Sequence, residues 1–380
     1  MRPERLDVIV IGGGQAGLAT GWHLARHELS FVILEAADRV GESWRRRWDG
    51  LRLFTAARYD GLPGMPFPAE PDSFPSKDDV ADYLEGYAAR IGLPVRTGVR
   101  VEGLRRADGG DHFEIVAGAD RFEAPAVVVA TGAHRLGRVP AFAAELDPRI
   151  RQCHSAEYRS PAELQPGPVL VVGASNSGAE VAVGAAGEHR TTLVGRDTGQ
   201  MPFPIDSRRA RAFDRFFFWF FINRVATLDT PIGRRAMPFV RDHGGPLERV
   251  RPSDLVAARV ERVVGRVVGA MDGQPVLDDG RIVQTTNIVW CTGFRPDFEW
   301  ITPPVIDGDG WPRQRRGVAL DQAGLYFVGL PFLHSAASSL LGGVGRDAGH
   351  VAGRVAARVL STATTSMGSR VGSPWATRRE

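Results

Sequence analysis

The chain has 380 residues, of which 43% are hydrophobic and 24% charged, and its formal net charge is +3 at pH 7. That length allows two or three domains with their own cores, while so small a net charge gives no electrostatic reason to expect nucleic-acid binding. The two cysteines, Cys153 and Cys291, exclude a disulfide scaffold, a zinc ribbon and a Cys-x-x-Cys redox centre. We expect a reducing, cytoplasmic setting, with no bound metal and no stable membrane insertion, because no apolar run reaches spanning length.

The predicted elements alternate between strands and helices, in the manner of an α/β protein. A βαβ unit over 6–35 is followed by structured loop over 39–75, a helix over 77–91 capped by Ser76, a β-meander over 95–131 and a connector over 132–167. A second βαβ unit begins at Pro168. The expected strands lie at 7–11, 31–34, 168–172, 191–195, 287–291 and 325–329, and the other helices at about 15–27, 176–187 and 345–360.

The first βαβ unit carries a glycine-rich turn that indicates a nucleotide site. Gly12, Gly14 and Gly17 form a Gly-x-Gly-x-x-Gly turn, which is typical of backbone that meets a pyrophosphate at a helix N-terminus. Glu35 ends the next strand, where a carboxylate accepts hydrogen bonds from ribose hydroxyls and repels a 2′-phosphate. This unit therefore predicts FAD or NAD rather than NADP.

The second βαβ unit carries an altered form of the same turn. Gly173 and Gly178 are present, but Ser175 replaces the middle glycine that lets backbone approach a pyrophosphate closely. Arg196 follows the next strand, and its planar guanidinium suits a 2′-phosphate, so NADPH is preferred over NADH; the alternative is an ordinary surface arginine. Two such turns in one chain indicate electron transfer between a nicotinamide and a flavin.

The order of the elements predicts a discontinuous first domain. We expect an α/β fold with two Rossmann-like dinucleotide-binding domains of the three-layer ββα/βαβ type, the second inserted into the first. The predicted FAD-binding domain covers 1–160 plus 290–360, the NADPH-binding domain covers 161–289 with an aromatic insert at 200–250, and 361–380 is expected to be a disordered tail.

Six further segments form a recognisable set: Gly-Glu-Ser-Trp at 41–44, Leu-Arg-Leu-Phe-Thr at 51–55, Met-Pro-Phe-Pro at 65–68, Phe-Pro-Ser-Lys at 74–77, His-Ser-Ala-Glu-Tyr at 154–158 and Cys-Thr-Gly-Phe-Arg-Pro-Asp-Phe at 291–298. Together they resemble the class B flavin-containing monooxygenases, and most of all the plant-type indole-pyruvate monooxygenases and their bacterial relatives. The likeness covers residues 5–360. It departs from the family pattern at four residues: Pro148 and Ile150 replace a phenylalanine and a glycine before His154, Ala56 replaces an asparagine near the flavin, and Ser175 replaces a glycine.

The resemblance implies that NADPH reduces FAD and that a flavin C4a-(hydro)peroxide, formed with O₂, oxygenates a small organic substrate. This chemistry needs no acid–base triad, so we name no catalytic side chain, and we interpret His154 as a structural histidine of the connector. One alternative is an NADPH oxidase or reductase of the same fold that inserts no oxygen. Another is a flavin-binding sensor without enzyme activity.

An intensely aromatic stretch at 213–222 follows basic residues at 208–215. It is interpreted as a helix packed into the insert domain or a homodimer contact, as the wall of a substrate channel, or as a membrane-surface helix. The first two are favoured because the aromatic block lacks a wide polar face. A channel wall would indicate an apolar or aromatic substrate.

The turns and the resemblance together give a set of candidate cofactor-binding residues, which includes the Gly-Leu and Leu-Gly-Gly segments near the C-terminal helix. The set is Gly12, Gly14, Gln15, Ala16, Gly17, Glu35, Ala36, Ser43, Trp44, Thr55, Val101, Thr131, Gly132, Gly173, Ser175, Asn176, Ser177, Arg196, Thr292, Gly293, Gly329 and Leu341.

Overall fold

The computed structural model describes residues 2–242 and 244–368, and a seven-stranded sheet forms the centre of its first unit. The strand order is β18-β19-β20-β8-β2-β3-β4. The run from β20 to β4 is parallel, and β18 and β19 add an antiparallel edge. The bounds are β2 (Val8–Ile11), β3 (Phe31–Leu34), β4 (Val95–Arg96), β8 (Ala126–Val129), β18 (Gln314–Arg315), β19 (Val318–Ala319) and β20 (Leu325–Phe327).

The alternation of side chains along β2 builds three layers. Val8 and Val10 pack into the core beneath the helices, whereas Ile9 and Ile11 pack into the core beneath a second sheet. The helices are α1 (Gln15–Ala25), α3 (Lys77–Ile91) and α8 (Val344–Gly368), and the second sheet has the order β1 (Glu4–Arg5), β7 (Asp120–Ala124), β6 (Phe113–Ala117) and β5 (Gly103–Arg106). Burial on both faces explains why β2 is apolar at every position.

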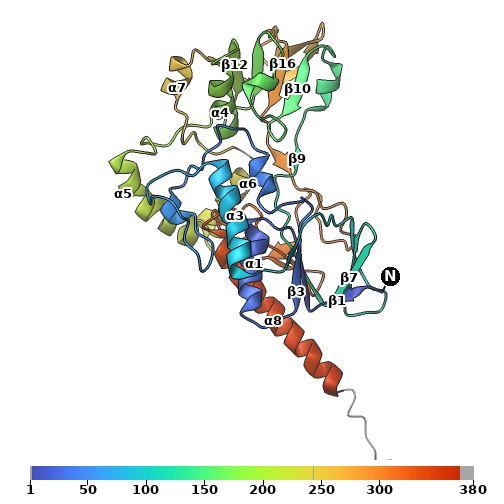
Figure 1. Cartoon of the computed structure of the whole chain (residues 1–380). Coiled ribbons are helices and arrows are strands. Elements are labelled where there is room, and N and C mark those ends of the chain that lie inside the picture. The colour runs from blue at the N-terminus through green and yellow to red at the C-terminus, as the bar shows by residue number, and fades with distance from the viewer. Residues whose placement is uncertain (1, 243, 369–380) are drawn as a thin grey trace, which may run out of the picture.

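The second unit is a smaller parallel sheet that stands apart from the first in Figure 1. Its order is β10 (Arg151–His154), β16 (Asn287–Trp290), β11 (Val169–Val172), β12 (Thr191–Gly195) and β13 (Glu261–Val264). One face is covered by α4 (Asn176–Ala185) and α7 (Pro252–Ala257), and the other by η2 (Ala141–Glu145) and the hairpin of β14 (Val267–Met271) and β15 (Gln274–Leu277). The predicted fold class, with two Rossmann-like units, is confirmed.

Strand pairing places the junction between the units earlier than the sequence prediction did. β10 pairs with β16 in the second sheet, although residues 151–160 were expected in the first domain. The chain passes between the units at a short antiparallel pair, β9 (Leu136–Gly137) with β17 (Phe294–Arg295). We therefore propose domain boundaries at this pair, in place of residues 160 and 290.

The aromatic insert packs on the first unit, although its sequence lies within the second. It forms α5 (Arg208–Phe216), the π-helical η4 (Phe217–Val225) and α6 (Pro231–Asp242). Within η4, the carbonyl of Asn223 accepts from the Arg346 guanidinium at 2.9 Å. Just beyond η4, the amide of Leu228 donates to the carbonyl of His334 at 2.8 Å. No helix within residues 2–242 and 244–368 has the length and apolarity needed to cross a bilayer.

Two helix ends show how local sequence sets the elements. The predicted cap of α3 is confirmed, because Ser76 and Asp79 form a reciprocal capping box. The first residues of the tail predicted at 361–380 are part of α8, which continues to Gly368, since residues 361–367 contain no proline or glycine to end it. Residues 369–380 lie outside the described residues. The remaining short helices are α2 (Glu42–Arg45), η1 (Ala57–Tyr59) and η3 (Pro161–Glu163).

Candidate functional site

Each of the three glycines of the first turn is required for a different physical reason. Gly12 has φ +110°, and a Cβ there would lie 2.7 Å from the carbonyl oxygen of Ala130. A Cβ on Gly17 would overlap the carbonyl oxygen of Gly12. Gly14 has an ordinary extended backbone, and a Cβ there would have no protein atom within 4 Å. Gly12 and Gly17 therefore close the turn, whereas Gly14 opens onto empty space.

Glu35 holds the same turn from the next strand. Its Oε2 accepts a hydrogen bond from the amide of Gly13 at 2.7 Å, and its Oε1 accepts one from the amide of Ala37 at 2.9 Å. Each carboxylate oxygen keeps a second lone pair, and Glu35 lines the cavity described next. The residue can therefore position the turn and accept from ribose hydroxyls together.

A cavity of about 450 Å³ extends from the first glycine turn to the helix of the second. Most candidate residues line it: Gly12, Gly14, Gln15, Ala16, Glu35, Ala36, Ser43, Trp44, Thr55, Val101, Thr131, Gly132, Ser177, Gly329 and Leu341. Gly17 lies beneath the turn instead, and Gly173, Ser175, Asn176, Arg196, Thr292 and Gly293 belong to the second turn and its surroundings. The tertiary structure thus joins candidates more than 300 residues apart in the sequence.

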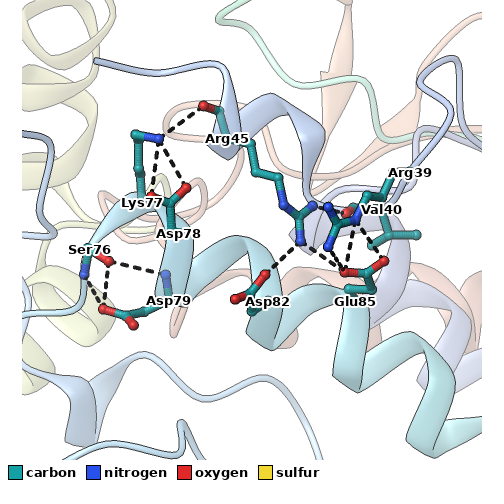
Figure 2. A network of polar contacts seen from close by, with 9 residues as sticks. All are labelled: Arg39, Val40, Arg45, Ser76, Lys77, Asp78, Asp79, Asp82 and Glu85. Atoms are coloured by element: carbon teal, nitrogen blue, oxygen red, sulfur yellow. Dashed lines mark hydrogen bonds and ion pairs between the residues drawn. The ribbon is translucent and has the colours of Figure 1, made fainter. Parts of the chain in front are cut away.

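A polar network fixes the segment that carries Ser43 and Trp44. Figure 2 shows the Arg45 guanidinium donating to the carbonyl of Val40 and to the carboxylates of Asp82 and Glu85 on α3. The ammonium of Lys77 donates to the carbonyl of Arg45 at 3.2 Å. This network ties α2 to α3 and so presents Trp44 to the cavity, where its Nε1 donates to Gln15 Oε1 at 3.3 Å.

The first site passes three tests for a flavin dinucleotide. The N-terminus of α1 opens at the cavity, and the missing side chain of Gly14 leaves room for a pyrophosphate. The buried Thr131 Oγ1, on the cavity wall, has no hydrogen-bond partner in the described part of the chain. A bound polar ligand would satisfy it, because buried polar groups are normally paired. The residues present therefore fit FAD.

The second turn repeats the backbone of the first but uses its side chains differently. Gly173 has φ +107°, and a Cβ there would overlap the carbonyl oxygen of Cys291. Ser175 Oγ donates to the carbonyl of Gly245 at 2.9 Å, and Asn176 Nδ2 donates to the carbonyl of Pro246 at 3.0 Å. These two candidates therefore hold the segment 244–248 against the turn, and Ser177 alone of the three faces the cavity.

The other candidates near the second turn have separate settings. Arg196 is exposed just beyond β12, where a 2′-phosphate could meet it from solvent. Thr292 Oγ1 donates to the carbonyl of Arg138, and Gly293 has φ +85°. His154 is buried: its Nδ1 accepts from the amide of Ala156, and its Nε2 lies 3.0 Å from the carbonyl oxygen of Gly293. With both ring nitrogens bonded to backbone, His154 has a structural role at the junction.

Sequence reasoning missed several residues of the cavity wall. Arg47, Trp48, Phe54, His134, Phe294 and Trp300 line it. Except for Phe294, which lies on the two-residue strand β17, they come from irregular segments, so no periodicity distinguishes them. The density of aromatic and basic residues in 44–54 was nevertheless a signal. Phe54 also lines a narrow apolar recess with Phe213 and Glu248. Because Phe54 lines both spaces, the recess adjoins the cavity, and Phe213 brings the start of the aromatic stretch to that recess.

A buried carboxyl lies directly behind the cavity wall. Thr55 Oγ1 donates to Asp60 Oδ1 at 2.6 Å, and the other carboxyl oxygen of Asp60 has no hydrogen-bond partner among the described residues. Asp60 is only 1% exposed. Burial raises its pKa to about 7, partly offset by the Thr55 hydrogen bond. Asp60 is thus partly protonated near neutral pH.

Two sheets, each with a parallel strand that leads into a glycine turn, and one cavity that reaches both turns define an oxidoreductase of the two-dinucleotide class. A family model described as "Pyridine nucleotide-disulphide oxidoreductase" matches residues 9–207. An "Uncharacterized oxidoreductase CzcO-like" of Geobacillus kaustophilus (strain HTA426) is 36% identical over 352 residues, with 90% of this chain and 96% of the relative covered. The chain belongs to this family and, within it, to the class B flavin monooxygenase-like group.

Two further comparisons describe that group. A "Probable indole-3-pyruvate monooxygenase YUCCA7" of Arabidopsis thaliana is 26% identical over 358 residues, covering 84% of this chain and 82% of the relative. The structure is similar to a flavin-containing monooxygenase from Stenotrophomonas maltophilia, with a TM-score of 0.73, 27% identity and coverage of 93% of this chain and 99% of that chain. The resemblance inferred from the sequence is confirmed, and the protein is a flavin-dependent oxidoreductase.

The cysteines separate this chain from the disulphide-reducing members that the family description includes. Cys153 and Cys291 are free thiols on β10 and just after β16. Burial raises the pKa of Cys153 to about 11 and that of Cys291 to about 12. Both are neutral thiols at pH 7 and therefore poor nucleophiles. Among the described residues, no three His, Cys, Asp or Glu side chains are grouped to hold a metal ion.

Proposed function

We propose that the protein is an FAD- and NADPH-dependent monooxygenase that acts on a small, apolar or aromatic organic substrate. The single observation that carries this is the cavity of about 450 Å³, which the first glycine turn and Ser177 of the second both reach. A cavity that both turns reach supports the proposal that two dinucleotides meet within one space. FAD occupies the first turn, and NADPH approaches from the second.

The chain's own residues bind, orient and exclude water. When bound, FAD would supply the hydride-accepting centre for NADPH and the means to activate O₂. Glu35 accepts from ribose hydroxyls, and the amides at the start of α1 face the pyrophosphate. Aromatic side chains of Trp48, Phe294 and Trp300 line the cavity and limit water, which protects reactive species from hydrolysis.

Oxygen insertion is tested by following the oxygen atoms. The FAD-loaded protein is incubated with NADPH, ¹⁸O₂ and an aromatic probe, for which indole-3-pyruvate is the first choice because relatives carry that name. We expect one ¹⁸O atom in the organic product and less hydrogen peroxide than NADPH consumed. Hydrogen peroxide equal to the NADPH consumed, with every probe and no labelled product, would instead establish the oxidase alternative.

We further propose that Arg196 selects NADPH over NADH. Replacing Arg196 with alanine removes charge-assisted hydrogen bonds to the 2′-phosphate, so the KM for NADPH should rise about 10- to 100-fold, while the KM for NADH stays within about twofold. Steady-state kinetics with both nucleotides measures this. Arg190→Ala is the matched control, because Arg190 is an exposed arginine that precedes β12 and pairs with Glu261. Equal changes for the two nucleotides would rule out the 2′-phosphate role.

A further inference from the structure

Arg47 is a cation of the cavity wall without a counterion. Its side chain is half-buried and lines the cavity. Its guanidinium carbon lies 5.3 Å from the centroid of the Phe294 ring. In the described part of the chain, neither a carboxylate nor a carbonyl accepts a hydrogen bond from it. Burial lowers the pKa of Arg47, and the nearby charge of Arg159 lowers it further.

The groups around Arg47 add positive charge or none. Arg159 is the second cation, and its guanidinium donates to the carbonyls of Ala156 and Tyr158 rather than to an acid. His134 contacts the same Phe294 ring, with centroids 5.3 Å apart. Desolvation by the surrounding protein lowers the pKa of His134 below its ordinary value, and the nearby charge of Arg47 lowers it further. His134 is therefore neutral at pH 7.

Arg135 shows how an arginine in the same wall is normally satisfied. It lines the same cavity, but its Nε lies 3.2 Å from Asp297 Oδ2 in an ion pair. Glu35, a carboxylate that lines the cavity, accepts from the amide of Gly13 in the first turn and from the amide of Ala37. A shielded charge is costly unless an opposite charge accompanies it. Arg100 also lines the cavity and has no acid partner among the described residues, but it is exposed to solvent. Arg47 is therefore the half-buried cation of this wall for which the anion must come from a ligand.

We propose that Arg47 is an anion-binding residue at the junction of the two units, which holds a phosphate or carboxylate group of a ligand bound across them. The proposal rests on the proposed function and narrows its ligand chemistry. Two sources supply such an anion: the pyrophosphate of the dinucleotide at the second turn, whose Ser177 lines the same cavity, or the carboxylate of an organic-acid substrate. A planar guanidinium suits either group.

Binding to the FAD-loaded protein tests the proposal without requiring oxygen insertion. Dissociation constants are measured by calorimetry for NADP⁺, for phenylpyruvate and for its methyl ester, with wild type, Arg47→Gln, Arg47→Lys and Arg47→Met. We expect Arg47→Gln to weaken NADP⁺ or phenylpyruvate about 10-fold or more, Arg47→Lys to weaken it less, and the uncharged ester to change little. Arg47→Met keeps the packing of the stem on Phe294 and separates loss of charge from loss of fold.

Each outcome is decisive. Weaker binding of NADP⁺ by the Arg47 variants assigns the anion to the dinucleotide. Weaker binding of phenylpyruvate, with binding of its ester unchanged, assigns the anion to the substrate. The matched control is Arg46→Gln, which removes the neighbouring exposed arginine that pairs with Glu42. The proposal is overturned if the Arg47 variants bind both anions within about twofold of wild type. It is also overturned if the wild-type protein binds neither anion, or if the variants lose FAD instead. A protein that proves to be an oxidase would still show the Arg47 effect.

Discussion

Replacing Gly14 with valine should give a folded protein that purifies without FAD. The backbone at Gly14 is extended, and no protein atom lies within 4 Å of where a Cβ would be, so the side chain meets no protein. It would project instead into the space that a pyrophosphate requires. We expect the purified variant to lack the flavin absorbance. Its free energy of unfolding should stay within about 1 kcal/mol of wild-type apoprotein.

The other glycines make this test specific. Gly17→Ala should destabilise the protein by about 3 kcal/mol or more, because its Cβ would overlap the Gly12 carbonyl. Gly86→Val is the matched control, since Gly86 is an exposed glycine of α3 with equally open surroundings. It should keep both fold and FAD. A yellow Gly14→Val protein with a full complement of FAD would contradict the placement of the pyrophosphate.

Replacing Asp60 with asparagine should remove a large part of the pH dependence of stability. The folded-state pKa of about 7 lies above the unfolded value near 3.9, so the folded protein binds the proton more tightly. The stabilisation is therefore complete below the unfolded pKa and is lost as pH rises to about 7. Linkage gives a loss of about 4 kcal/mol over that window.

Urea unfolding of the apoprotein between pH 4 and pH 8 measures this effect. The difference between wild type and Asp60→Asn isolates Asp60, because other buried carboxyls with raised pKa values, such as Glu180 and Glu248, titrate in both proteins. We expect Asp60→Asn to become more stable relative to wild type as pH rises. Burying the asparagine N–H groups has its own energetic cost, but that cost does not change with pH. Thr55→Val is the companion variant, since it removes the hydroxyl that donates to Asp60. Parallel pH profiles for wild type and Asp60→Asn would contradict a raised pKa.

The elements that were predicted well are those whose pattern is local. Strands 31–34 and 191–195 and helix 77–91 have the bounds that the sequence predicted. An apolar run defines the first strand, a short run of β-branched and apolar residues defines the second, and a capping serine defines the start of the helix. The sheet to which residues 151–154 belong is not determined by their local pattern. Their strand pairs with β16, more than 130 residues later, and no property of the segment itself selects that partner.

The aromatic insert shows the same limit. Its composition allowed a packed helix, a channel wall or a membrane-surface helix, since each requires an apolar face. The contacts of 223–228 with 334–346 settle its position on the first unit, and Phe213 reaches the recess beside Phe54. Those contacts join segments more than 100 residues apart in the sequence, so the composition of the insert alone does not predict them.

The sequence by itself determined the class of the protein. Two glycine turns after apolar strands, Glu35 and the missing Cys-x-x-Cys each express a local requirement of backbone, charge or thiol chemistry. Only the tertiary structure decided the wall of the cavity, the use of Ser175 to hold the segment 244–248, and the unpaired charge of Arg47. The physical reason is that burial and the presence or absence of a hydrogen-bond partner depend on which distant segments pack together. A short stretch of sequence does not contain that information.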